Sequence, residues 1–265
     1  MAIWNVTDHE YHADREHVSR SALEIFRQSP KLYQKWKNHE WESPQTASQR
    51  LGAAFHCNLL QPEIFSQEYM KTEFSDRRTK KYKEFALQHL NVTLLTTSEI
   101  LKLRKMMNSV EDNPVAMDLL KYNQGLREQA YKFTDDTMLQ CKFKVDYYHN
   151  GTIVELKTTQ DVSEQTWCKS AYNFGYHRQA AFYTKGIKIL QHFNPNFLFV
   201  VVGTTEPYEC IVREFDSLSV TLGMKEINSL LKDLSMRLKT NDFCPLGHNK
   251  INWVSLPSWC FSKGP

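Results

Sequence analysis

The chain has 265 residues, of which 41% are hydrophobic, so it can bury a full core at the upper end of the usual size of one domain. Its net charge of +3 is only mildly basic, and composition alone therefore does not indicate a nucleic-acid partner. Six scattered cysteines without a Cys-x-x-Cys pair argue against a zinc ribbon or a disulfide-stapled secreted scaffold. We therefore expect reduced thiols in a cytoplasm, and neither an export signal nor a membrane anchor.

The N-terminal half is predicted to be helical. Ser19 precedes an apolar run with helical periodicity, which is typical of a capped helix start. A second helix is expected over Ala47 to Leu60, and it carries His56. Thr97 is expected to cap a longer helix that ends near Asn113-Pro114.

Strands are predicted in the second half of the chain. They cover Ala130–Phe133, Met138–Tyr148, Thr152–Lys157, Phe197–Val202 and Cys210–Phe215. The pair Asn150-Gly151 fits a tight hairpin turn between the second and third of them. Further helices are expected over Ser163–Lys185 and Leu218–Leu238. This order predicts an α/β protein of one domain, residues 1–265, with a mixed central β-sheet flanked by helices and a helical N-terminal half.

Three charged residues of the predicted hairpin are expected to meet. Asp146 lies near the end of one strand, and Glu155 and Lys157 lie two positions apart on the next. Side chains two apart on a strand share a face, and the hairpin brings Asp146 alongside them. Glu155-Leu-Lys157 is the only acid-x-Lys triplet in the chain, and it follows two apolar residues, where unpaired charges are costly.

Two carboxylates and an ammonium group suit the hydrolysis of a phosphodiester. Carboxylates hold Mg²⁺ or Mn²⁺, which stabilises the charge on the phosphoryl group and activates water. The amine of Lys157 then orients or helps to deprotonate that water and faces the developing negative charge. The backbone carbonyl of Leu156 adds a further oxygen ligand. The alternative is a surface hairpin that carries charges by chance.

Longer segments of the sequence resemble the RecE (exodeoxyribonuclease VIII) nuclease-domain family of the PD-(D/E)XK nuclease superfamily. The segments, in chain order, are HADREHVSRSALEIFRQSPKLY, LGAAFHCNLLQPEIF, DRRTKKYKE, CKFKVDYYHNGTIVELKTTQDVS, YNFGYHRQAAFYTKG and INWVSLPSW. The acid-x-Lys core alone is a weakly specific sign of this family, whereas the six segments in this order are a strongly specific one. The resemblance implies a PD-(D/E)XK nuclease fold over nearly the whole chain.

The resemblance also implies roles for single residues. His56, Asp146 and Glu155 would hold the metal ion, and Lys157 would be catalytic. His56 matches a histidine that this family carries on a helix, although a lone helical histidine is otherwise more often structural. An imidazole ligand favours Mn²⁺ beside Mg²⁺. Glu155 departs from RecE itself, where aspartate is expected, so the metal spacing or preference is expected to shift.

Gln179 and Tyr183 match a Gln-x-x-x-Tyr pair on the family's helix beside the active site. They are four residues apart and therefore share one face of a helix. From spacing alone, packing by Tyr183 and solvent contact by Gln179 are equally good interpretations.

Two segments are candidates for contacts to DNA. A basic cluster at the start of a helix is expected to bind backbone phosphates, and its residues are Arg77, Arg78, Lys80 and Lys81. The alternative is a solvated helix start. By the position of its segment in related exonucleases, the group Ser19, Arg20 and Ser21 is expected to cradle a terminal 5′ phosphate. A helix cap by Ser19 or Ser21 explains that segment as well.

The activity that the resemblance implies is a processive exonuclease that degrades one strand of linear double-stranded DNA from 5′ to 3′. A ring-shaped homo-oligomer and transfer of the single strand to an annealing protein of the RecT kind are implied as well. The setting would be the cytoplasm of a bacterial cell or phage-infected host. Two alternatives remain open: a structure-specific or restriction-like endonuclease with the same metal core, and a DNA-binding protein without catalysis.

Overall fold

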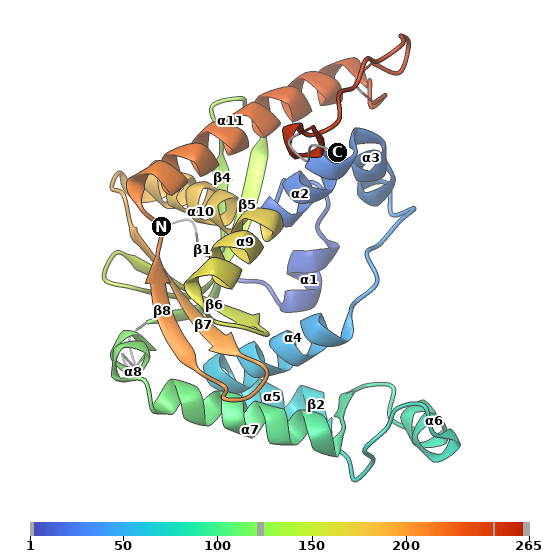
Figure 1. Ribbon diagram of the computed structural model, residues 1–265, viewed down its shortest axis with the longest axis vertical. Coiled ribbons are helices and arrows are strands. Elements are labelled where there is room, and N and C mark those ends of the chain that lie inside the picture. Colours follow the sequence, from blue (N-terminus) through green and yellow to red (C-terminus); the bar gives the residue numbers. More distant parts are fainter. Residues whose placement is uncertain (1–2, 121–124, 246, 262–265) are drawn as a thin grey trace.

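A six-stranded mixed β-sheet lies at the centre of the protein (Figure 1). The computed structural model describes residues 3–120, 125–245 and 247–261. The strands, in their order across the sheet, are β1 (Ile3–Trp4), β4 (Leu126–Thr134), β5 (Gln140–His149), β6 (Thr152–Thr159), β7 (Asn196–Gly203) and β8 (Cys210–Glu214). Neighbouring strands are antiparallel except β6 and β7, which are parallel and are joined through two helices. The mixed sheet and its flanking helices confirm the predicted α/β architecture.

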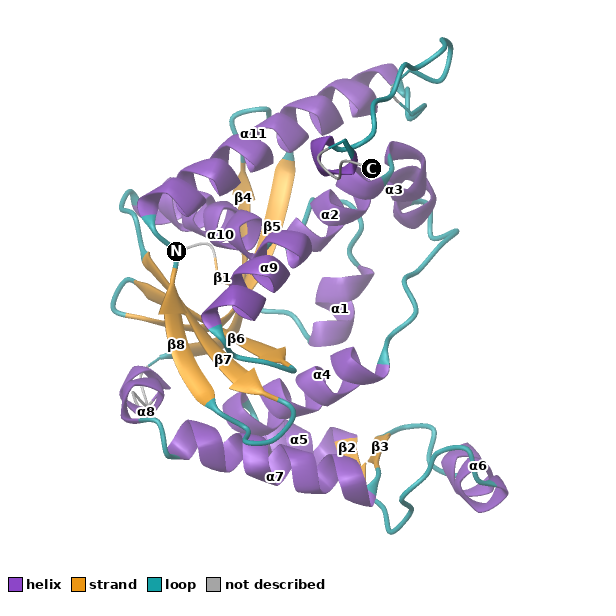
Figure 2. Ribbon diagram, viewed as in Figure 1, coloured by secondary structure: helices purple, strands orange, loops and turns teal. Residues whose placement is uncertain are grey.

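Helices cover both faces of the sheet (Figure 2). One layer consists of α2 (Arg20–Gln28), α3 (Pro30–Lys37), α9 (Glu164–Phe174), α10 (Tyr176–Gln191) and α11 (Ser217–Thr240). The opposite layer consists of α4 (Ala47–Leu60), α5 (Pro62–Glu68), α7 (Thr97–Glu111) and α8 (Pro114–Leu120). Because apolar residues of the sheet face both layers, the molecule has two hydrophobic cores with the sheet between them.

The remaining elements are small. Helix α1 (Asp8–Ala13) lies against β5, where Lys142 donates hydrogen bonds to the carbonyl oxygens of Tyr11 and Asp14. A two-stranded parallel sheet consists of β2 (Tyr69–Lys71) and β3 (Thr93–Leu95), with α6 (Lys80–Leu87) between them in sequence. A short 3-10 helix covers Ser258–Cys260. None of the helices in the described ranges combines the length and apolar content needed to cross a membrane.

The hairpin between β5 and β6 has the tight turn that the sequence predicts. Asn150 and Gly151 both have positive φ angles, 44° and 75°, as a two-residue turn of the type favoured by the twist of β-hairpins requires. The strands pair on either side of the turn, His149 with Thr152 and Tyr148 with Ile153. This register fixes which residues of β5 and β6 lie opposite one another.

Most long elements match the prediction, with differences at their ends. Helix α4 begins and ends at the predicted residues. Thr96, rather than Thr97, caps α7 through its side chain. The helix predicted over residues 163–185 is divided at Gly175, whose φ of 68° ends α9 and precedes α10. Strand β5 begins at Gln140, because Met138, with a φ of 68°, still belongs to the preceding turn.

Close packing between α10 and β5 gives a stability prediction at Gly186. A Cβ atom at this position would collide with the ring of Phe143, which is fully buried and stacks on Tyr131 at 5.1 Å between ring centroids. Overpacking costs up to about 3 kcal/mol, whereas Gly→Ala in a helix gains about 1 kcal/mol. Gly186→Ala is therefore expected to lower the free energy of unfolding by about 2 kcal/mol in urea denaturation. The loss should shrink in a Phe143→Leu background, and equal losses in both backgrounds would contradict the collision.

Candidate active site

Asp146 and Glu155 lie at the point where the ladder between β5 and β6 ends. The last paired residues are Tyr147 and Val154, and one further step of this register places Asp146 opposite Glu155. Beyond this pair, backbone amides donate hydrogen bonds to side-chain carboxylates instead of to backbone carbonyl oxygens. The amide of Asp146 donates to Oε1 of Glu155 at 3.3 Å, and the amide of Leu156 donates to Oδ2 of Asp146 at 2.7 Å. The two carboxylates are thereby fixed between the strands.

His56 and Glu128 complete a set of potential metal ligands around Asp146. His56 reaches the sheet from α4, and its Nδ1 lies 3.4 Å from Oδ2 of Asp146. One ligand atom from each of His56, Glu128 and Asp146 lies within 4.8 Å of the others. An imidazole nitrogen with carboxylate oxygens suits a small divalent cation such as Mg²⁺ or Mn²⁺. The donor set therefore fits a divalent metal ion, and it contains His56 and Asp146 of the predicted ligands together with Glu128. Glu155 lies outside this group, so metal binding by Glu155 and Leu156 stays a prediction.

Glu128 is the residue that sequence reasoning missed. Arg127 pairs with Tyr147 and Gln129 pairs with Val145, so Glu128 lies opposite Asp146 across β4 and β5. Its φ of 50° is uncommon for a side-chain-bearing residue inside a strand and is typical of functional sites. The predicted strand began only at Ala130, two residues after Glu128. Extending that strand back would have placed Glu128 beside Asp146.

The second carboxylate oxygen of Glu155 accepts hydrogen bonds from Lys157 and Gln179. Its side chain is buried, with the residue 1% exposed, and Oε2 accepts hydrogen bonds from Nζ of Lys157 at 3.0 Å and from Nε2 of Gln179 at 2.5 Å. Lys157 shares the face of β6 with Glu155, and Gln179 reaches it from α10. Of the two predicted residues on α10, Gln179 therefore contacts the acidic centre directly. Tyr183 packs against Phe143 of the core.

The buried charges shift the pKa values of their neighbours in different directions. Burial and the charge of Asp146 raise the pKa of Glu155, and Lys157 opposes this shift. Burial also acts to raise the pKa of Asp146, but the interactions with His56, Lys157 and the Leu156 amide outweigh it and lower the pKa. Burial acts to lower the pKa of His56, whereas Asp146 raises it overall. Divergent shifts within one pocket are typical of functional sites.

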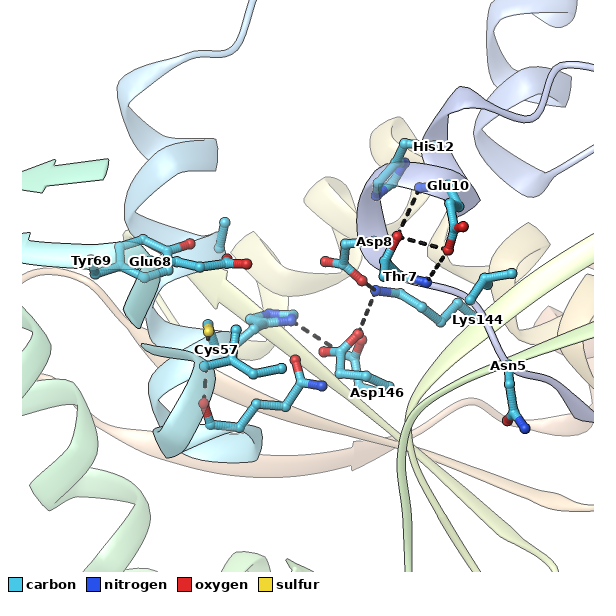
Figure 3. Close-up of a pocket in the computed structure, with 16 residues that line it drawn as sticks. Asn5, Thr7, Asp8, Glu10, His12, Cys57, Glu68, Tyr69, Lys144 and Asp146 are labelled. Carbon is cyan, nitrogen blue, oxygen red and sulfur yellow. Dashed lines mark hydrogen bonds and ion pairs between the residues drawn. The ribbon is translucent and has the colours of Figure 1, made fainter. Parts of the chain in front are cut away.

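A cavity of about 690 Å³ opens in front of His56, Glu128 and Asp146. Its walls come from the segment Asn5–His12, from α4 and α5, and from β4 and β5. Figure 3 shows Asp8, Lys144 and Asp146 directed toward one another inside it. Because the ligand atoms face this space, a phosphate group in the cavity has direct access to them.

The predicted basic cluster lies apart from this site (Figure 1), and Arg77 is turned inward. Its guanidinium donates to Oε2 of Glu99 at 2.7 Å, to the carbonyl oxygen of Leu94 and to the hydroxyl of Tyr82, which ties the turn before α6 to α7, β3 and α6. Arg78 pairs with Asp76 and Lys80 lies 3.8 Å from Glu84, both on the surface, and Lys81 is exposed. The structure therefore gives Arg77 a role in folding, whereas phosphate binding by Arg78, Lys80 and Lys81 stays a prediction.

The predicted group Ser19, Arg20 and Ser21 lines a second cavity of about 540 Å³. Ser19 caps α2, since its Oγ accepts a hydrogen bond from the amide of Ala22 at 3.1 Å, so the helix-cap interpretation is confirmed. Arg20 donates to the carbonyl oxygen of Phe174. Tyr183 lines the same cavity, which connects this group to the helix that carries Gln179.

Comparisons with known proteins agree with this architecture. Residues 19–255 match the family described as "PDDEXK-like domain of unknown function (DUF3799)". A solved structure from Eubacterium rectale, described as "putative exonuclease", superposes with a TM-score of 0.68 at 14% identity, covering 99% of this chain and 100% of that one. The structure of SSO0001 matches with a TM-score of only 0.30 at 10% identity, over 78% of this chain and 86% of that one. No curated protein matches the chain. The chain belongs to this PDDEXK-like family.

Proposed function

We propose that the protein is a divalent-metal-dependent DNA nuclease that acts as an exonuclease on one strand of linear double-stranded DNA. The observation that carries the proposal is the group His56, Glu128 and Asp146 at one open pocket, with the buried Glu155 next to it, hydrogen-bonded to the Asp146 amide and to Lys157. Carboxylates, an imidazole and an ammonium group in this arrangement meet the requirements of metal-assisted phosphodiester hydrolysis.

In the proposed mechanism each side chain has a distinct task. His56, Glu128 and Asp146, together with Glu155, would hold the cation, which when bound would supply charge stabilisation for the phosphoryl group and a water molecule of lowered pKa. Lys157 remains charged, because Glu155 and Asp146 outweigh burial and raise its pKa, so its ammonium faces the negative charge that develops on the phosphate. Gln179 orients Glu155 through the 2.5 Å hydrogen bond.

The cavity beside Arg20 supports the proposal that a 5′ end is recognised. Arg15 and Arg20 both line this cavity. Guanidinium groups form charge-assisted hydrogen bonds with phosphate oxygens. A terminal phosphate held here would account for the direction from 5′ to 3′. A ring-shaped oligomer and an annealing partner of the RecT kind complete the proposal, on the strength of the resemblance to RecE.

A digestion experiment tests the proposed activity. Linear duplex DNA labelled at the 5′ or the 3′ end and covalently closed circular DNA of the same sequence are incubated with the protein and Mg²⁺. We expect mononucleotides from the linear DNA, loss of the 5′ label first, faster digestion of 5′-phosphorylated than of 5′-hydroxyl ends, and no digestion with a chelator. Cleavage of the circle would instead support an endonuclease, and release of label from neither end would contradict the exonuclease.

A further inference from the structure

Lys144 places a fixed positive charge inside the cavity that faces the metal ligands. Its Nζ forms an ion pair with Oε2 of Glu128 at 2.7 Å and a second one with Asp8 of α1. The Lys144 side chain is only 14% exposed, and that of Glu128 only 10%. Figure 3 shows Lys144 between Asp8 and the carboxylate group around Asp146. The ammonium therefore occupies a position bounded by carboxylate oxygens.

Glu128 belongs to two groups of side chains at once. It lies within 4.8 Å of His56 and Asp146, and it is also the partner of Lys144. Nucleases with two metal ions place the ions about 3.5–4 Å apart and share carboxylates between them. Here the ammonium group of Lys144 already lies 2.7 Å from Glu128, the carboxylate that a second cation would have to share. A second divalent cation beside Glu128 would face Lys144 at close range and be repelled.

We propose that Lys144 takes the place of a second divalent cation, so that each chain binds one metal ion, held by the group around His56 and Asp146. Lys144 then acts as a positioning residue, because it holds Glu128 at the ligand group without occupying the metal position itself. The contact with Asp8 also ties α1 to the wall of the cavity. This inference rests on the proposed function, since it assumes that the ligand group binds a divalent cation.

The number of Mn²⁺ ions bound per chain tests the inference without any activity measurement. The full chain is titrated with Mn²⁺, and free Mn²⁺ is followed by its electron paramagnetic resonance signal. We expect one ion per wild-type chain and two per chain of Lys144→Met, in which Asp8 and Glu128 become free to hold the second ion. Lys144→Arg keeps the charge and is expected to bind one ion.

A double variant identifies where the second ion binds. Lys144→Met with Asp8→Asn should return to one ion, because the freed site has then lost a carboxylate. Lys144→Gln serves as a second replacement should the methionine variant fail to fold, which circular dichroism detects. Two ions in the wild-type chain, or one in folded Lys144→Met and Lys144→Gln, would overturn the inference. A wild-type chain that binds no Mn²⁺ would contradict the proposed function instead.

Discussion

Asp146→Asn is expected to reduce the rate of DNA hydrolysis by about a thousandfold or more, a loss at the upper end of what removal of a single electrostatic contact in an active site causes. The substitution keeps the shape of the side chain but removes the charge that lies 3.4 Å from His56 and between Glu128 and Glu155. Asparagine still accepts the hydrogen bond from the Leu156 amide, so the hairpin should remain intact. The loss would therefore come from weakened metal binding.

Two measurements separate metal binding from folding in this variant. Mn²⁺ affinity should fall together with the rate in a protein that stays folded. The midpoint of thermal unfolding should fall slightly, because the fold stabilises the charged form of Asp146 through His56, Lys157 and the Leu156 amide. Asp118→Asn on α8 removes an exposed carboxylate and serves as the matched control, with unchanged rate and affinity. An Asp146→Asn protein that hydrolyses DNA at the wild-type rate would rule out Asp146 as a metal ligand.

Lys157→Met is expected to lower the rate by a factor of about 10²–10³, as removal of one group that stabilises transition-state charge typically does. Its ammonium contacts Glu155 at 3.0 Å and lies beside, rather than within, the group His56, Glu128 and Asp146. Mn²⁺ affinity should therefore be kept or increase, because a positive charge near the cation is removed. This combination of low rate and retained metal binding distinguishes Lys157 from Asp146.

The matched control for this variant is Lys232→Met, which removes an exposed lysine of α11. Its rate should equal that of the wild type, so that a nonspecific loss of positive charge is excluded as the cause. Steady-state measurements on a short end-labelled duplex should show the loss in kcat rather than in KM. Loss of Mn²⁺ binding in Lys157→Met would mean that the lysine supports the metal site instead of the chemical step.

The central part of the site could be predicted because its geometry is local. Asp146, Glu155 and Lys157 lie on two strands joined by a two-residue turn, and the pattern Asn150-Gly151 fixes the register of that hairpin. Alternation along β6 then decides which side chains share a face. For the same reason the end of α4 could be predicted from the proline that follows it, Pro62.

Glu128 was missed for a local reason, because the predicted strand began two residues too late for the pairing of β4 with β5 to include it. Other parts of the site depend on long-range contacts that no local pattern specifies. Lys144 acquires its role only because α1, far away in sequence, supplies Asp8. Arg77 resembles a surface phosphate ligand in the sequence, yet tertiary packing directs it to Glu99. In each case the partner lies on an element that is separated in the chain and brought close by folding.

Diffraction from crystals of the protein soaked in Mn²⁺, recorded at a wavelength where manganese scatters anomalously, tests the central claim most directly. We predict an anomalous peak within bonding distance of Asp146 and His56, on the side of the hairpin that faces the cavity, with Glu155 or Glu128 as a further ligand. Absence of a peak at these side chains in crystals that contain manganese elsewhere would contradict the claim.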